Sequence, residues 1–296
     1  MDHMNIGLLT ADLDSANMGC NALTYSAIII LEEIAERLKL NFKYTLFKNI
    51  HAHSVLLYSN LDEKKIKCIP PVIAPLVKLK AMLKGKSAPI KHFNKSFSAC
   101  DVFFEIAGGD SFSDIYGIQR PVLFERYHSK IKESRKPLIF LPQTIGPFKS
   151  NRAKKIAANS LSYATHVFAR DPISYEKAVE FAQKEHVSRS VDMAFFMDHV
   201  PRKNESSRPV VGLIPSGLLW NGGYTGTNQF GLKSDYQELI TKIIEKLHQE
   251  NFKVVIVPHV LHGPTYHVED DYRVGKLLLK KYPFCDRSEE RRVGKE

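Results

Sequence analysis

The chain has 296 residues, of which 44% are hydrophobic and 25% are charged, and its 42 basic and 32 acidic side chains give a formal net charge of +10. This is the composition of a globular protein with one large or two medium-sized domains, and no apolar run reaches the roughly 20 residues of a membrane-spanning helix. Neither zinc-finger spacing nor an RNA-binding signature accompanies the positive charge, so it favours small anions or anionic polysaccharide over nucleic acid.

Cysteine usage and the first residues both predict a cytoplasmic protein. The four cysteines, Cys20, Cys68, Cys100 and Cys285, lie far apart and form no CxxC pair. This spacing predicts reduced thiols rather than a disulfide framework or a zinc site. No basic segment followed by a long apolar one opens the chain, so we expect no signal peptide.

Strand-like and helix-like segments alternate through the first two thirds of the chain. Helical periodicity marks residues 21–40, 118–134, 150–164 and 172–185. Short apolar runs mark strands at residues 5–11, 43–50, 101–107, 136–142 and 165–171. Residues 70–100, which are basic and proline-rich, are expected to form helices and a loop over the sheet edge. This alternation predicts a parallel sheet with helices on both faces.

The pattern divides the chain into two Rossmann-like domains, at residues 4–197 and 209–286. A polar, proline-flanked linker at 198–208 separates them, and alternation then resumes. The second domain shows strands at 209–216 and 252–260 and helices at 235–250 and 269–282. Two strands are few for such a sheet, so we expect this domain to be incomplete, with an exposed sheet edge or apolar face. We expect 287–296 to be a non-native tail that packs against nothing.

Polar clusters follow the predicted strands, where ligands of parallel sheets bind. After the first strand, Asn17, Gly19 and Asn21 lead into the first long helix. The free amides of that helix would receive an anion. Equally well, Asn21 would simply cap the helix.

The segment Phe104–Gly117, "FEIAGGDSFSDIYG", is the least ordinary of these loops. Gly108 and Gly109 permit positive φ or close approach of a ligand to the backbone. Asp110 and Asp114 are candidates for binding sugar hydroxyls or acting as a base, and Ser111 could donate to an anion. A turn followed by a helix cap is the alternative, but one turn does not need so many polar groups.

Three further strand ends carry candidate residues. Gln143 both donates and accepts hydrogen bonds, and Arg170 offers a planar fork for carboxylate or phosphate. The alternatives for Arg170 are a structural pair with Asp171 or a loop in which Asp171 caps the next helix. His259 begins a segment that also contains His262 and His267. A metal site is conceivable there, but an acid or anion-donor role for a strand-end histidine is favoured.

Five motifs occur in order at these positions: "NMGCNAL", "IAGGDSFSD", "LPQTIGPF", "VFARDPISY" and "VDMAFF". This ordered set resembles the polysaccharide pyruvyl transferase family over residues 5–285. The resemblance implies a GT-B-like fold, in which two Rossmann-like domains face a cleft. It also implies transfer of a pyruvyl group from phosphoenolpyruvate to two hydroxyls of a sugar as a ketal.

The resemblance implies roles for the candidate residues. Arg170, His259 and Asp110 are expected to be catalytic, with Arg170 gripping the donor. The expected substrate-binding residues are Asn17, Gly19, Gly108, Gly109, Ser111, Asp114 and Gln143. No metal or cofactor is expected, phosphoenolpyruvate being a co-substrate. The family also has a later Arg-x-His motif that this sequence lacks, so a fragment ending here is expected to lack part of the donor site.

The expected acceptor is a sugar or polysaccharide precursor, which would hold the protein at the inner face of the membrane if it is lipid-linked. Two other functions stay open. A GT-B glycosyltransferase using a nucleotide sugar would share the fold, so fold alone cannot separate it from a pyruvyl transferase. A non-catalytic sugar- or anion-binding module is the other alternative, against which the strand-end acids argue.

Overall fold

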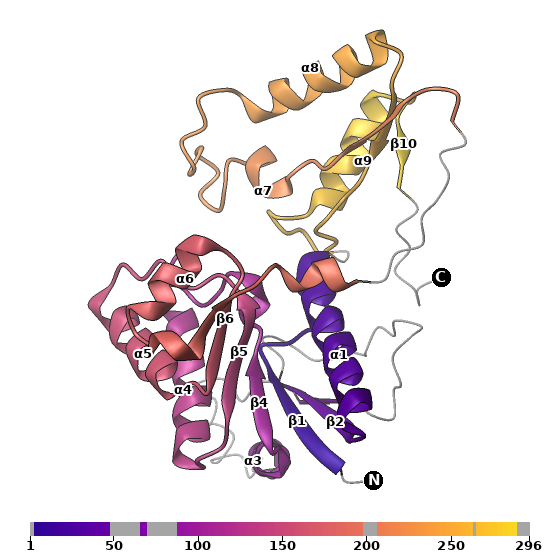
Figure 1. Ribbon diagram of the computed structural model, residues 1–296. Helices are drawn as coiled ribbons and strands as arrows, with labels where there is room; N and C mark the ends of the chain where they lie inside the picture. Colours follow the sequence, from indigo (N-terminus) through magenta and orange to yellow (C-terminus); the bar gives the residue numbers. More distant parts are fainter. Residues whose placement is uncertain (1–2, 48–65, 70–87, 198–205, 263–264, 289–296) are drawn as a thin grey trace. The chain divides into compact units, whose positions relative to one another are not determined.

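The computed structural model describes residues 3–47, 66–69, 88–197, 206–262 and 265–288. The chain folds as two compact units (Figure 1). The first comprises Met1–Asp14 and Gly19–Met197, and the second comprises Ser15–Met18 and Asp198–Glu296. Most of the expected linker and residues 289–296 of the expected tail lie outside the described residues.

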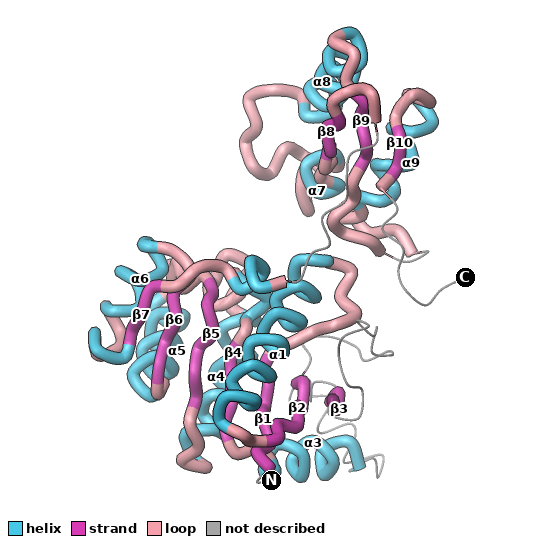
Figure 2. Tube along the Cα trace, turned by 45° about the vertical axis from the view of Figure 1, so that its right-hand side comes forward, coloured by secondary structure: helices cyan, strands magenta, loops and turns pink. Residues whose placement is uncertain are grey.

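The first unit is built on a seven-stranded sheet in the order β3-β2-β1-β4-β5-β6-β7 (Figure 2). Every neighbouring pair is parallel. The strands are β1 (His3–Leu9), β2 (Asn41–Phe47), β3 (Ile66–Ile69), β4 (Val102–Glu105), β5 (Leu138–Gln143), β6 (His166–Ala169) and β7 (Val187–Arg189).

Helices cover both faces of this sheet. They are α1 (Met18–Leu38), α3 (Ala88–Ala99), α4 (Gln119–Glu133), α5 (Asn151–Tyr163) and α6 (Pro172–Val179), with 3-10 turns η2 (Ala107–Gly109), η3 (Lys184–His186) and η4 (Met193–Phe196). Successive strand residues point to opposite faces. Phe103 therefore packs in an aromatic-rich core under α3, α4 and α5, whereas its neighbour Phe104 contacts the aliphatic core beneath α1.

The order of the strands creates a switch point between β1 and β4. From β1 the chain builds outward through β2 to β3, and from β4 it builds in the opposite direction through β5 and β6 to β7. Crossover connections leave such neighbouring strands in opposite directions, which opens a crevice at their carboxyl ends. The loops after Leu9 and Glu105 therefore begin at the place where ligands of this fold class bind.

The second unit is a smaller parallel α/β unit. Its sheet has the order β10-β9-β8, formed by β8 (Val210–Leu213), β9 (Lys253–Ile256) and β10 (Asp286–Arg287). Its helices are α7 (Gly217–Trp220), α8 (Tyr236–Gln249) and α9 (Asp271–Lys281). Ile240 and Ile244 of α8 and Val274 and Leu278 of α9 are buried with Ile256 of β9. Parallel α/β architecture is thus confirmed in both units.

Three strands were not predicted, namely β3, β7 and β10, because their sequences, IKCI, VSR and DR, contain no sustained apolar run. The helix expected over 172–185 ends at Val179. The expectation that residue 287 packs against nothing is wrong. Arg287 lies in β10 and pairs with Ile256 of β9. Its guanidinium lies 5.7 Å from the ring centroid of Tyr272.

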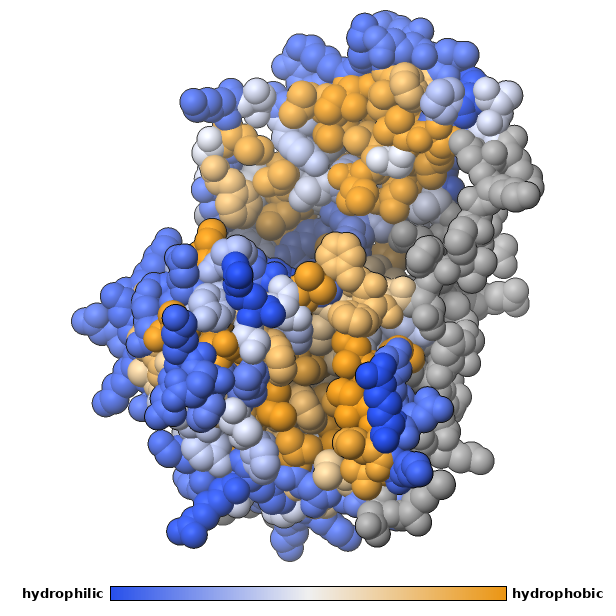
Figure 3. All heavy atoms as spheres, viewed as in Figure 1, coloured by the Kyte–Doolittle hydropathy of each residue, from blue (hydrophilic) through white to orange (hydrophobic). Residues whose placement is uncertain are grey.

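The second unit also carries the exposed features that its sequence predicts. Among the described residues, β8 pairs with β9 alone and is an edge strand of the sheet. Apolar side chains gather on the face of the second unit that is seen in Figure 3. The exposed large apolar residues of this unit are Val210, Ile214, Tyr224, Phe230, Leu232, Leu239, Tyr266, Leu277 and Phe284.

Candidate functional site

The loop after β4 has an unusual backbone at the switch point. Ala107, Gly108 and Gly109 adopt φ values of 51°, 54° and 92°, and Thr10 at the end of β1 adopts 48°. An L-residue pays roughly 1–2 kcal/mol for this left-handed conformation. The backbone is therefore strained at both Thr10 and Ala107, which lie next to each other. Such strain persists where the surrounding structure enforces it, and it is concentrated at functional sites.

The buried carboxylate of Glu105 enforces this conformation. Its Oε1 accepts from the Ala107 N–H at 2.8 Å and contacts the Thr10 hydroxyl. The same Ala107 N–H also reaches Thr10 Oγ1 at 2.8 Å. Glu105 is fully buried, so each of these bonds replaces a contact with water that folding removed. The turn is thus tied to both strands of the switch point.

A buried relay extends from Glu105 into the helices. Glu105 Oε2 lies 3.0 Å from His128 Nε2 on α4, and His128 Nδ1 lies 2.9 Å from the Ser160 hydroxyl on α5. All three side chains are at most 3% exposed. Although this order of groups is that of a nucleophilic triad, no substrate can reach Ser160 in this position, so the relay supports the loop.

Gln143 joins the loop after β4, called the GGD loop after Gly108, Gly109 and Asp110, to the loop after β5. Its Nε2 donates to the Glu105 carbonyl at 2.9 Å, and the next residue, Thr144, donates its N–H to the Gly109 carbonyl at 2.8 Å. Gln143 is fully buried, and its Oε1 has no hydrogen-bond partner among the described residues. Its expected contact with substrate stays a prediction, whereas its contact with the loop backbone is direct.

Asp114 makes the second connection between these loops. Its two carboxylate oxygens accept from the Lys149 and Ser150 N–H groups, each at 2.8 Å, just before α5 begins. Desolvation alone would raise the pKa of Asp114, but these backbone donors outweigh it and hold the pKa below its ordinary value. With both oxygens engaged, Asp114 is a structural acceptor, and a role as a base would require these bonds to break.

Arg170 lies directly beside the GGD turn. Its Nη1 donates to Asp192 Oδ2 at 2.8 Å, and a Cβ placed on Gly109 would lie 3.1 Å from that Nη1. The Arg170 side chain is 26% exposed. Among the described residues, only Asp192 accepts from this guanidinium, which leaves further donors of its five N–H groups for a ligand.

Asp171 and Asp192 have separate tasks near Arg170. The expected alternative of an Arg170–Asp171 pair is wrong, because Arg170 pairs with Asp192. Asp171 instead caps α6, accepting from the Ser174 N–H at 2.8 Å, as the second alternative predicted. Asp192 belongs to the "VDMAFF" motif and also caps η4 through the Ala194 N–H at 2.9 Å. The sequence motif alone did not indicate that this acid pairs with Arg170.

Of the remaining polar groups of the GGD loop, Asp110 is partly accessible and the two serines are buried. Asp110 is half-buried, and its Oδ2 accepts from the Tyr116 hydroxyl at 2.7 Å. The Ser113 hydroxyl donates to the Asp110 carbonyl at 3.1 Å, whereas Ser111 is 7% exposed and lies beneath Gly108. Within this loop, Asp110 is therefore the acid best placed to meet a ligand.

The first turn of α1 brings Cys20 to the same loop. Cys20 Sγ lies 3.9 Å from the Gly108 carbonyl, a contact that the sequence did not indicate. Asn21 does not cap the helix, because α1 begins at Met18 and Asn21 is buried within the first turn. The amides at this end are engaged: Asn17 N–H donates to Ser15 Oγ at 3.2 Å and Met18 N–H to the His259 carbonyl at 3.2 Å. The expected anion site at Asn17 and Gly19 stays a prediction.

The histidine-rich segment belongs to the second unit. His259 is exposed, and its N–H donates to Asp271 Oδ2 at 3.2 Å. Asp271 also accepts from the N–H groups of Val260 at 2.8 Å and Gly217 at 2.6 Å, so it fixes the backbone after β9. His262 and His267 lie together, apart from this arrangement, with their rings stacked at a centroid distance of 3.8 Å.

A groove of about 370 Å³ lies elsewhere on the first unit. Its lining comes from the later turns of α1 and the residues that follow, namely Ile29, Glu32, Glu33, Ala35, Glu36 and Leu40. Since α1 begins after the carboxyl end of β1, these turns lie toward the opposite edge of the sheet. The groove is therefore separate from the loops described above.

The part of the first unit that could bind an anion is thus well defined. It consists of Arg170, which follows β6, and the glycine turn at Gly108 and Gly109 with the acid Asp110, which follow β4. Only β5 separates these two strands, and Arg170 reaches the turn across it. A family model described as polysaccharide pyruvyl transferase matches residues 17–291. The chain belongs to this family. The five motifs quoted from the sequence all lie within the matched residues.

Comparisons with solved structures give distant likenesses. UDP-GlcNAc 2-epimerase from Methanocaldococcus jannaschii is 10% identical with a TM-score of 0.46, over 97% of this chain and 73% of that chain. Arabidopsis thaliana UGT89C1 complexed with UDP-L-rhamnose is 10% identical with a TM-score of 0.43, over 86% and 64%. The glycotransferase of kitacinnamycin is 10% identical with a TM-score of 0.37, over 90% and 68%. No curated protein sequence matches the chain.

One helix among the described residues meets the length and hydropathy of a membrane span. This helix is α1, with a mean hydropathy of 1.2 over its most apolar window, and half of that window is buried inside the protein. Its inner residues, including Ile28 and Leu31, pack in the core against β1 and β2. A core helix of an α/β unit has these properties, so α1 is weak evidence for a membrane protein.

Proposed function

We propose that the chain transfers a pyruvyl group from phosphoenolpyruvate to a sugar of a polysaccharide or its precursor. Membership of the polysaccharide pyruvyl transferase family supports the reaction class. The single observation that supports the donor assignment is the position of Arg170, partly exposed beside a glycine turn at the carboxyl edge of the sheet. Phosphoenolpyruvate carries a carboxylate and a phosphate, and a guanidinium binds either group through two parallel hydrogen bonds.

The proposed reaction is balanced without a further reactant. Protonation of C3 of phosphoenolpyruvate leaves positive charge at C2, which one sugar hydroxyl attacks. The bond from C2 to the phosphate oxygen breaks, and the second hydroxyl adds to C2 to close the ketal. Two hydroxyl protons are lost: one balances the proton added at C3, and the other leaves with the released phosphate. Such a reaction needs an acid, a base and fixed positive charge at the leaving phosphate.

The residues take separate roles in this proposal. Arg170 holds the donor, and its bond to Asp192 fixes the guanidinium beside Gly109. Asp110 accepts a proton from, or binds, an acceptor hydroxyl, because Tyr116 contacts one of its oxygens, whereas backbone N–H groups bind both oxygens of Asp114. His259, exposed in the second unit, serves as the acid or as a phosphate contact. A lipid-linked acceptor would bring this cytoplasmic enzyme to the inner face of the membrane.

The test supplies the full chain with phosphoenolpyruvate and a panel of sugar acceptors. Phosphate release that depends on acceptor, together with a product mass increased by one pyruvyl ketal, is the expected result. A parallel arm replaces phosphoenolpyruvate with nucleotide sugars. Release of nucleoside diphosphate in that arm alone would reject pyruvyl transfer in favour of glycosyl transfer, and saturable sugar binding without product in either arm would favour a binding module.

A further inference from the structure

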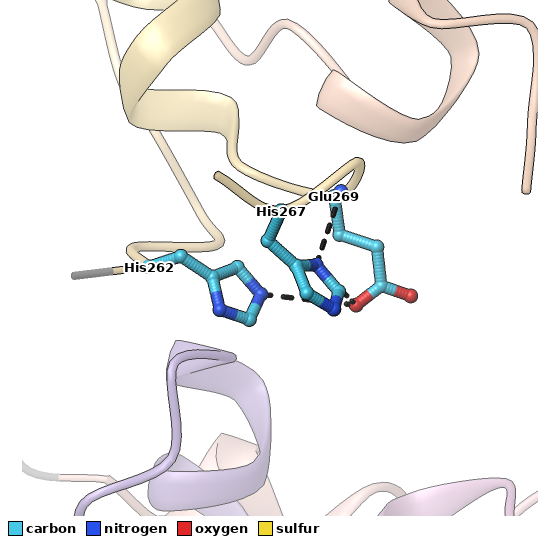
Figure 4. A group of neighbouring side chains, drawn as sticks. All are labelled: His262, His267 and Glu269. Atoms are coloured by element: carbon cyan, nitrogen blue, oxygen red, sulfur yellow. Dashed lines mark hydrogen bonds and ion pairs between the residues drawn. The ribbon is translucent and has the colours of Figure 1, made fainter. Parts of the chain in front are cut away.

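Three side chains with metal-binding groups converge in the second unit. His262, His267 and Glu269 each offer one ligand atom, and these atoms lie within 4.8 Å of one another. Figure 4 shows the two imidazole rings side by side, with the Glu269 carboxylate next to them, in the loop between β9 and α9. We propose that this cluster binds a divalent transition metal ion of the zinc type.

The distances suit such an ion closely. Glu269 Oε2 lies 3.9 Å from His262 Nε2 and 3.8 Å from His267 Nδ1. Zinc binds nitrogen and oxygen ligands at 2.0–2.2 Å, which places neighbouring ligand atoms about 3.4 Å apart at the tetrahedral angle. The two separations from Glu269 therefore need to shorten by about half an ångström, and that between the histidine nitrogens by at most about 1.4 Å. All three residues are partly exposed.

The charges favour a cation over an anion. A strand-end histidine alone suits an anion, but here a carboxylate lies within 4 Å of both rings. Glu269 would repel an anion at this point. A doubly positive ion would instead be attracted by the carboxylate charge and bound by the lone pairs of two neutral imidazoles. Two histidines with one glutamate form a ligand set that zinc uses where a fourth position stays open to water or substrate.

A further contact orients the carboxylate. The Tyr224 hydroxyl donates to Glu269 Oε1, the oxygen that does not face the histidines. Partners of this kind fix ligating groups and commonly change metal affinity by about 10- to 100-fold. Tyr224 comes from the loop after α7, so the cluster is tied to a second segment of the unit.

The rings must turn slightly to bind an ion. In the structure they stack with an interplanar angle of 22°, so the lone pairs in their planes run side by side. His267 Nδ1 also accepts from the Glu269 N–H at 3.3 Å, a long bond. Rotation about the Cβ–Cγ bond of His267 changes the direction in which Nδ1 and Nε2 point.

The test measures zinc binding to the full chain after treatment with a chelator and dialysis. Isothermal titration should detect a zinc ion bound at this cluster, and cobalt should give visible absorption typical of a tetrahedral site. His262→Ala, His267→Ala and Glu269→Gln should each weaken this binding by at least about tenfold, and Tyr224→Phe by roughly tenfold. His259→Ala is the matched control, since His259 lies in the same segment outside the cluster, and it should bind zinc as the unchanged chain does.

Thermal unfolding without metal shows whether each variant folds, and His262→Gln and His267→Gln replace any alanine variant that does not. Zinc should raise the Tm of the unchanged chain more than that of the folded variants. The proposal is overturned if the unchanged chain binds no zinc, if all three ligand variants keep its affinity, or if His259→Ala loses as much. Because every readout is metal binding, failure of pyruvyl transfer does not affect this result.

Discussion

Arg170 and Asp192 form a 2.8 Å ion pair that joins the end of β6 to the turn after β7. The "ARD" and "VDMAFF" motifs are therefore one structural feature, although 22 residues separate these two side chains in the sequence. The Asp192 carboxylate accepts a hydrogen bond from one N–H group of the Arg170 guanidinium and so fixes the orientation of the guanidinium.

Arg170→Lys should weaken the use of phosphoenolpyruvate without unfolding the protein. Lysine keeps the charge but loses the planar fork, so a charge-assisted hydrogen bond worth about 1.5–3 kcal/mol is lost, or roughly 10- to 150-fold in kcat/KM. Steady-state kinetics and thermal unfolding measure the two effects. Arg189→Lys is the control, because Arg189 also ends a strand, β7, but does not adjoin Gly109. Equal kinetics for Arg170→Lys and the unchanged chain would assign Arg170 a purely structural role.

Gly109→Ala should destabilise the protein more than Gly117→Ala. Both glycines have positive φ, 92° and 87°, so both substitutions incur the left-handed strain of about 1–2 kcal/mol. The new Cβ at Gly109 would also lie 2.8 Å from Leu23 Cδ1, whereas nothing lies within 4 Å of one at Gly117. Urea unfolding should show about 1–3 kcal/mol of additional loss at Gly109. Equal losses at the two positions would mean that the GGD turn is not closely packed.

Glu105→Ala should be among the most destabilising changes in the first unit. It removes the buried partner of His128 Nε2 and one of two bonds at both the Ala107 N–H and the Thr10 hydroxyl, which keep Thr10 Oγ1 and the Leu9 carbonyl as acceptors. We expect a loss of about 2–4 kcal/mol in the free energy of unfolding, from roughly 1–3 kcal/mol for the orphaned imidazole and about 0.5–1.5 kcal/mol for each lost bond. Glu125→Ala, which removes only a 3.9 Å pair with Arg152 on the surface, should change stability by less than about 1 kcal/mol.

The contribution of Asp114 should depend on pH in a defined direction. Its pKa in the folded protein lies below the ordinary 3.8, so the folded state stabilises the charged form. The resulting stability is fully present above the pKa of the unfolded chain and is lost as the pH falls through the lower folded value. The stability difference between the unchanged chain and Asp114→Asn should therefore hold from pH 7 to about 5 and shrink below about 4. A difference that grows on acidification would contradict this.

Thiol labelling should divide the four cysteines into two classes. Burial raises the pKa of Cys100 to about 11, and burial with the nearby Asp286 raises the pKa of Cys285. Both side chains are at most 6% exposed, whereas Cys20 and Cys68 are half-buried. Since the thiolate is the reactive form, an aromatic disulfide reagent at pH 7 should label Cys20 and Cys68 first. Mass spectrometry of the labelled peptides identifies them. Rapid labelling of Cys100 would contradict the burial of this side chain between α3 and β4.

Sequence patterns identified the polar residues at the strand ends, but not the buried hydrogen bonds that support the loops there. Arg170 and the GGD loop were recognisable because polar residues and glycines directly follow apolar strands. The partnership of Glu105 with His128 was not recognisable, since pairing across 23 residues depends on how α4 packs on the sheet. A signal did exist: Glu105 interrupts the apolar run "VFFEIA", and His128 follows Phe124 by one helical turn on the buried face of α4. A buried acid inside a strand demands a buried donor nearby.

Residues 15–18 give the second unit a discontinuous chain. The Ala16 carbonyl accepts from the Leu261 N–H at 2.8 Å, and Asn17 forms an isolated bridge with Val260. During synthesis the ribosome releases this short segment long before it makes Val260 and Leu261, so these bonds form only after all the intervening residues have emerged. Assembly of the second unit therefore cannot be completed before Leu261 is made, and a fragment that begins after Met197 would leave the backbone around Leu261 without its native partner.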